Sequence, residues 1–110
     1  MAWEIVYHSD ALQKDILALP VGIQARFIRI TERMLLLGPD LGMPHTRALG
    51  DGLFEIRAKS AEGIGRVFYC TLIQQHIVML HCFVKKSDAT PPKELRVARQ
   101  RLKEVKDANA

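Results

Sequence analysis

Basic side chains gather in a part of the sequence that alternates as β-strands do. In the run LFEIRAKS, Arg57 and Lys59 lie two residues apart, so both project from one face of an extended strand. The run GRVFY adds Arg66, and the apolar run IVMLHCFV ends in Lys85 and Lys86. Cations placed this closely repel one another unless an anion lies among them. Their spacing therefore favours the binding of a polyanion, such as a phosphate backbone.

One turn decides whether these side chains meet on the same face of a sheet. A two-residue turn at residues 74–75 would join strands at 64–73 and 76–84 as a hairpin. In that register, the side chains that share one face are Arg66, His81, Phe83 and Lys85. One extra residue in the turn would move the members from the second strand to the opposite face. We expect the two-residue turn, and with it an exposed cationic face that also carries an aromatic ring.

His81 lies in the middle of the last predicted strand, between Leu80 and Cys82, and faces Phe68 in the expected register. A histidine in such a position is commonly a hydrogen-bonded core residue. The cationic neighbours on its own face favour a second interpretation, in which the imidazole transfers protons near neutral pH. Both interpretations stay open on the residues alone.

The composition is that of an ordinary globular protein with an uneven distribution of charge. The chain has 110 residues, of which 48% are hydrophobic and 25% charged, enough for one compact domain over residues 1–110. Residues 1–50 hold five basic and five acidic side chains, whereas residues 51–110 hold eleven basic and seven acidic ones, which accounts for the net charge of +4. This asymmetry favours a polyanion or an acidic protein as the partner.

Membrane, secretion and metal signals are missing from the sequence. There is no run of about 18 apolar residues, and the N-terminal run MAWEIVYHSD has neither the basic region nor the apolar stretch of a signal peptide. We therefore expect a cytoplasmic protein. Cys70 and Cys82 are expected to be reduced core residues, and without a CxxC motif or a His/Cys cluster no metal site is expected.

The remaining pattern predicts the elements that must position the cations. In order, they are a strand at 2–7, helices at 10–19 and 21–37, a loop at 39–46, strands at 53–59, 64–73 and 76–84, and a basic helix that starts at Pro91. An apolar stripe on the last helix consists of Leu95, Ala98, Leu102 and Val105. The predicted class is α+β, an antiparallel sheet of about four strands with two N-terminal helices on one face and a C-terminal basic helix. We interpret Arg26, Arg29 and Arg33 in the second helix as a solvated face.

Three stretches of the sequence resemble the phage-derived branch of the RelE/HigB toxin family. They are LGDGLFEIR (49–57), GRVFY (65–69) and IVMLHCFVKKSDATPPKE (77–94), and the pattern LHxFxKK is the most specific part. The resemblance covers nearly the whole chain. It implies a RelE-like fold and a type II toxin that cleaves mRNA, often in dependence on the ribosome, without a cofactor. It also implies a partner antitoxin, commonly a helix-turn-helix protein of the HigA type.

The resemblance further implies roles for individual basic residues. Arg66 of GRVFY matches the arginine at the start of the third strand of the family. Arg57 or Lys59 matches the basic position on the preceding strand, and Lys85 with Lys86 matches the cluster at the end of the last strand. These residues are the expected catalytic cations, with Arg57 and Arg66 stabilising the phosphoryl charge.

The implied reaction is attack of a ribose 2′-hydroxyl on the adjacent phosphate. A lysine crowded by other cations gives up its proton more readily, so Lys59 or Lys85 is the expected base. The family often has a tyrosine or histidine after the last basic cluster, but here that region reads SDATPP, and His81 is expected to substitute. The residues expected to bind RNA are Phe83, Lys86, Lys93 and Arg96.

A second class of function fits the same residues. The cations could dock a nucleic acid or an antitoxin without cleaving anything, as in a degenerate toxin that keeps only the fold and the partner. The alternation of the strands does not separate docking from cleavage.

Overall fold

The structure is a computed structural model that describes residues 2–72, 74–85 and 90–109. In chain order the elements are β1 (Glu4–Tyr7), α1 (Asp10–Leu17), α2 (Val21–Leu37), β2 (Thr46–Gly50), β3 (Leu53–Ser60), β4 (Gly63–Leu72), β5 (His76–Lys85) and α3 (Pro92–Ala108). The strands form one sheet in the order β1-β5-β4-β3-β2, in which β1 runs parallel to β5 and the other neighbours are antiparallel. No helix in the described ranges is long and apolar enough to cross a membrane.

The predicted α+β class is confirmed, although two details of the sheet differ. The sheet has five described strands, not about four, because residues Thr46–Gly50 pair with β3 as an additional edge strand. The sheet is mixed, since the opening strand inserts beside β5 in the parallel direction. A parallel neighbour needs a long crossover connection, and the two N-terminal helices with the three antiparallel strands after them provide it.

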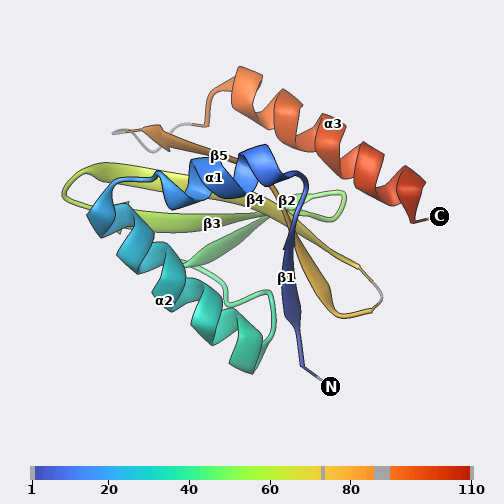
Figure 1. Cartoon of the computed structure of the whole chain (residues 1–110), viewed down its shortest axis with the longest axis horizontal. Helices are drawn as coiled ribbons and strands as arrows, with labels where there is room; N and C mark the ends of the chain where they lie inside the picture. The colour runs from blue at the N-terminus through green and yellow to red at the C-terminus, as the bar shows by residue number, and fades with distance from the viewer. Residues whose placement is uncertain (1, 73, 86–89, 110) are drawn as a thin grey trace.

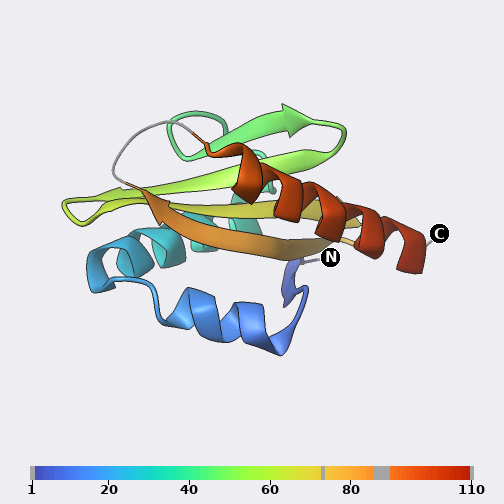
Figure 2. The same ribbon diagram turned by 90° about the horizontal axis from the view of Figure 1, so that it is seen from above.

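Helices cover both faces of the sheet, as Figure 1 and Figure 2 show: α1 and α2 lie along one face and α3 along the other. The core under α1 and α2 includes Leu12, Ile16, Ile23, Phe27, Ile30, Met34, Ile56, Val67, Ile77 and Met79. The smaller core under α3 contains Leu53, Phe68, Cys70, Val78, Leu80, Ala98 and Leu102. The apolar stripe predicted for the last helix is therefore buried, and the expectation that the second face is left open is wrong.

The ends of the helices follow local chemistry with small shifts from the predicted bounds. Ser9 caps α1, and its hydroxyl accepts a hydrogen bond from the amide of Leu12 at 3.1 Å. Pro20 gives α2 no side-chain cap, but the carboxylate of Glu62 accepts from two amides in the first turn of that helix. This contact fixes α2 to the β3–β4 turn. Helix α3 begins at Pro92, one residue later than predicted.

The register of β4 and β5 depends on a β-bulge. The two strands begin to pair at Leu72 and His76, so three residues separate them instead of the predicted two. On its own, that difference would move the side chains of the outer half of β5 to the opposite face of the sheet. A bulge next to Phe68 absorbs one additional residue of β5 and restores the side-chain orientation. Beyond the bulge the pairs are the predicted ones, Phe68 with His81 and Arg66 with Phe83.

Gly65 permits the close packing of α2 on the sheet, because a Cβ at that position would lie 2.2 Å from Cγ2 of the buried Ile23. We expect Gly65→Ala to lower the free energy of unfolding by about 1–3 kcal/mol through overpacking. Ala48→Val, on an exposed position of β2, is the control and should change it by less than about 0.5 kcal/mol. Urea titration measures both, and an unchanged midpoint for Gly65→Ala would contradict this packing.

Candidate functional site

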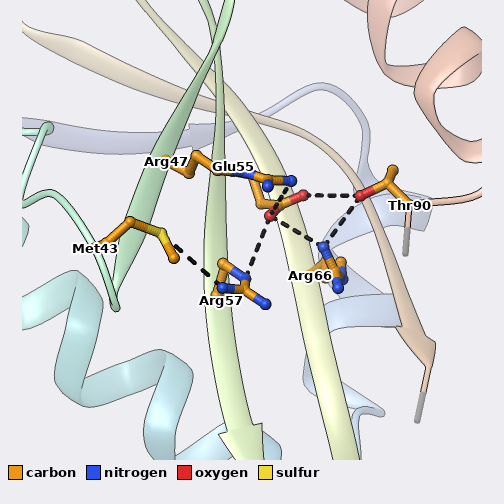
Figure 3. Close-up of polar contacts among 6 residues, drawn as sticks. All are labelled: Met43, Arg47, Glu55, Arg57, Arg66 and Thr90. Carbon is orange, nitrogen blue, oxygen red and sulfur yellow. Dashed lines mark hydrogen bonds and ion pairs between the residues drawn. The ribbon is translucent and has the colours of Figure 1, made fainter. Parts of the chain in front are cut away.

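The carboxylate of Glu55 is the centre of a charged cluster on the α3 side of the sheet (Figure 3). Its Oε1 atom lies 3.3 Å from Arg47, 3.6 Å from Arg57 and 3.2 Å from Arg66. The sheet brings these residues together because Arg47 is the β2 partner of Glu55, and Arg66 is the β4 partner of Arg57. Glu55 and Arg57 share a face because they lie two residues apart on β3. Three adjacent strands therefore surround one carboxylate with guanidinium groups.

Thr90 joins this cluster to the start of α3. Its Oγ1 atom accepts a hydrogen bond from Arg66 at 3.1 Å and donates one to Oε2 of Glu55 at 3.5 Å. The side chains of Glu55 and Arg66 are both fully buried. A buried ion pair is tolerated only where further hydrogen bonds compensate for lost hydration, and Thr90 supplies them here.

The cluster carries more positive than negative charge and reaches the surface. Three guanidinium groups and one carboxylate leave a formal charge of +2. The side chain of Arg47 is 40% exposed and that of Arg57 is 16% exposed, whereas Arg66 is inaccessible. Arg57 also donates towards the sulfur of Met43 at 4.0 Å. The accessible edge of the cluster, formed by Arg47 and Arg57, is thus a place where an anion can meet fixed donors.

The structure brings together most of the predicted catalytic cations, but not as one open surface. Arg57 and Arg66 are direct cross-strand partners. Lys59 and Lys85 are both exposed and pair with Ile64 of β4 from opposite sides, so they lie at the ends of β3 and β5, beyond the arginines. Lys86 falls outside the described residues.

Arg66 departs most clearly from its predicted place. It was expected on an exposed face, yet its side chain has no accessible surface and is bound by Glu55 and Thr90. The sequence held one signal for this arrangement: Glu55 lies two residues before Arg57 and so shares its face. The sequence gives no comparable indication that Thr90 binds Arg66, because that contact depends on the path of the chain between β5 and α3.

His81 is also in a different environment from the predicted one. Its Nε2 atom lies 2.8 Å from the carboxylate of Glu94 on α3, and its side chain is 17% exposed. The ring stacks against Phe68 and Phe83. Its charged neighbour is therefore an acidic residue rather than the predicted Arg66 or Lys85, because α3 crosses this part of the face.

The residues predicted to bind RNA have different exposures. Phe83 is half-buried and stacks on Phe68 with a centroid distance of 5.7 Å. Lys93 and Arg96 are exposed on the first half of α3. Arg96 borders a cleft of about 580 Å³ along that helix, together with Pro92, Leu95, Arg99 and Gln100.

The two cysteines and Tyr69 are poorly accessible: Cys70 and Tyr69 are buried and Cys82 is half-buried. Burial raises the pKa of Cys70 and of Cys82 to about 11, and both thiols are free. Burial also raises the pKa of Tyr69, whose hydroxyl donates to the carbonyl of Pro39. The described residues contain no group of three or more His, Cys, Asp or Glu side chains arranged to hold a metal ion. The side chains that the Glu55 cluster offers to a ligand are cationic, so they suit the binding of an anion.

The arrangement of helices and strands places this protein in a known structural class. A chain in the crystal structure of the archaeal RelE–RelB complex from Pyrococcus horikoshii OT3 matches this one with a TM-score of 0.56 and 18% identity, over 81% of this chain and 100% of that chain. At that identity the likeness concerns the fold, which is RelE-like. No curated protein matches the sequence.

The sequence then shows the family. Residues 14–103 match the family described as "Phage derived protein Gp49-like (DUF891)". Since the match spans most of the chain, this protein belongs to the Gp49-like family of phage-derived proteins.

Because Glu55 is half of a buried ion pair, its substitution should lower the stability of the protein more than that of any other polar residue in the cluster. Glu55→Gln places a neutral amide beside the inaccessible guanidinium of Arg66, and we expect the free energy of unfolding to fall by about 3–5 kcal/mol. The double variant Glu55→Gln/Arg66→Met should recover part of that loss, because it removes the buried charge as well. Asp51→Asn is the control, since Asp51 forms an exposed pair with Arg99 at 3.7 Å and should cost less than about 1 kcal/mol. A Glu55→Gln loss as small as the control's would contradict the cluster.

The raised thiol pKa values predict slow alkylation of the folded protein. A higher pKa leaves less thiolate at a given pH, so at pH 8 iodoacetamide should modify Cys70 and Cys82 far more slowly than in urea. Mass spectrometry over a time course measures the rates. Equal rates in the folded and unfolded protein would mean that the thiols are not buried.

Proposed function

We propose that this protein is the toxin of a type II toxin–antitoxin module and acts as a metal-independent mRNA endoribonuclease. The observation that carries the proposal is the +2 cluster of Arg47, Arg57 and Arg66 around Glu55, with Lys59 and Lys85 exposed at the same end of the sheet. Membership of the Gp49-like family and the RelE-like fold support it. RNA, rather than DNA, is the substrate because the reaction needs a 2′-hydroxyl nucleophile.

The arginines bind and stabilise the phosphate that reacts. Arg57 and Arg47 present guanidinium groups at the surface, while Glu55 holds both in place before the substrate arrives. Donors fixed in this way stabilise negative charge on the phosphoryl oxygens without the cost of reorganising. Arg66, which is inaccessible, is a positioning residue that acts through Glu55. This role replaces the direct phosphate contact predicted for it.

Proton transfer completes the reaction. Lys59 or Lys85 removes the proton from the 2′-hydroxyl, the resulting oxygen bonds to phosphorus, and the bond from phosphorus to the 5′-oxygen breaks. His81, oriented by Glu94, returns a proton to that leaving oxygen. The products are a 2′,3′-cyclic phosphate and a free 5′-hydroxyl. Each proton transfer of this type contributes about 10²–10⁴-fold in rate.

The partners follow from the same proposal. The matched structure is described as a RelE–RelB complex, which supports an antitoxin partner for this chain, and we propose a helix-turn-helix antitoxin of the HigA type. The mRNA would be cut in the cytoplasm on the ribosome. Lys86, Phe83, Lys93 and Arg96 would contact the RNA beside the cleaved link.

A second candidate function is a binding module that has lost catalysis. It is favoured by the complete burial of Arg66, whose contacts with Glu55 and Thr90 suit a structural role. The absence of a histidine or tyrosine in the run SDATPP also favours it. Such a module would hold RNA or the antitoxin and leave transcripts intact.

Cleavage by purified protein tests the two candidates. With translating ribosomes and a labelled mRNA, we expect fragments that end in a 2′,3′-cyclic phosphate, and no product where a 2′-deoxynucleotide replaces the cleaved one. Arg57→Ala and Lys85→Ala should each lower the rate by about 10²-fold or more. Lys14→Ala, an exposed cation on α1, should stay within about twofold of the parent. Intact mRNA that still binds the protein would favour the binding module instead.

A further inference from the structure

Exposed apolar side chains are concentrated on the side of the molecule opposite the Glu55 cluster. Among the described residues, the large apolar side chains that are exposed lie mostly in α2 or at the end of α1. They include Leu17, Val21, Ile28, Leu35, Leu36 and Leu37. Large exposed apolar side chains gathered on one element often mark a site of protein interaction. Leu37, at the end of α2, is 77% exposed and belongs to this group.

Three of these residues form a straight row, which we call the apolar stripe: Val21, Ile28 and Leu35. They recur every seven residues along the 17-residue helix α2, and residues at that spacing lie on one line of a helix surface. The side chains of Val21 and Ile28 are 81% and 49% exposed. From Val21 to Leu35 the row spans about 21 Å of the helix, which is long enough to contact a partner helix over several turns.

A second row on the outer face of α2 is basic. This arginine row consists of Arg26, Arg29 and Arg33, which line a cleft of about 240 Å³ with Ile30 and with His45 from the loop before β2. Within the described ranges, none of the three guanidinium groups has an ion pair or a side-chain hydrogen bond. No acidic side chain lines the cleft. The row is therefore a set of exposed cations whose guanidinium groups are unpaired in the part of the chain that the structure describes. It lies around the helix from the apolar stripe, with the exposed Ala25, Glu32 and Leu36 between the two.

We infer that the outer face of α2 docks a partner protein through a helix that presents apolar side chains flanked by acidic ones. The apolar side chains of the partner would cover the stripe, and its carboxylates would enter the arginine-lined cleft. Arginine together with large apolar residues is the composition of protein interfaces. This inference is independent of the proposed ribonuclease activity, because α2 packs on the face of β3 that carries Ile56, whereas Glu55 and Arg57 point to the other face.

The same features disfavour the two other occupants. A nucleic acid would use the arginine row but would gain little from aliphatic side chains, since bases stack on aromatic rings or guanidinium planes. A second copy of this chain would bring like charges together, because Arg26, Arg29, Arg33 and Glu32 give the exposed face of α2 a net charge of +2. Symmetric association repeats that charge on both sides of the interface.

The test uses the full chain and two synthetic helical peptides as probes. Both peptides carry leucines at heptad positions a and d, and one carries glutamates and the other lysines at e and g. Fluorescence anisotropy should show that the glutamate peptide binds at least about tenfold more tightly than the lysine peptide. Ile28→Glu should abolish binding of the glutamate peptide. Arg29→Glu/Arg33→Glu should reverse the preference between the peptides.

A control variant and three contrary results complete the experiment. Lys103→Glu, an exposed cation on α3, should leave the preference unchanged, and thermal unfolding checks that each variant is folded. Equal affinity for the two peptides in the parent protein would overturn the inference. So would a 2′-O-methyl RNA oligonucleotide that binds only while Arg29 and Arg33 are intact, with no peptide binding. Sedimentation showing a dimer that Ile28→Glu dissociates would assign the face to a second copy.

Discussion

The buried carboxylate of Glu55 is the interaction on which the cationic side of this protein depends. Strands β2, β3 and β4 bring three guanidinium groups into one small volume, and without a negative charge among them their repulsion would oppose the pairing of the strands. The arginines differ in exposure from Arg66, which is inaccessible, to Arg47 at the surface. The cluster therefore holds one guanidinium group inside the domain, at Arg66, and presents another at the surface, at Arg47.

Helix α3 limits how much of that charge a ligand can reach. Thr90 and Glu94, at the start of the helix, bind Arg66 and His81, so the polar contacts on this face join the sheet to the helix. Further along α3, Ala98 and Leu102 are buried against β4 and β5. The accessible cations of the site are Arg47 and Arg57 at the edge of the cluster and Lys59 and Lys85 at the end of the sheet. The candidate site is therefore smaller than an open sheet face.

The two sides of the sheet present different chemistry to partners. The α3 side offers fixed arginines around a carboxylate, an arrangement suited to phosphate oxygens. The exposed face of α2 offers aliphatic side chains and arginines, a composition suited to another protein. The partners proposed for the two faces would therefore not compete for one surface. Gly65 and the Glu62 cap hold α2 against the sheet that carries both faces.

The sequence by itself determined the α+β class and the positions of the three helices, because hydrophobic periodicity is a local property. The predicted pairing of Arg66 with Phe83 is found, but only because a bulge offsets the longer turn. It could also place Glu55 on the face of Arg57. Only the tertiary structure decided that a bulge would compensate for the longer β4–β5 turn, that α3 would cover the second face, and that Arg66 would be buried. Burial depends on which segments, distant in the chain, pack above a residue. The packing energies that decide this arise from the whole domain, so a short run of residues does not predict them.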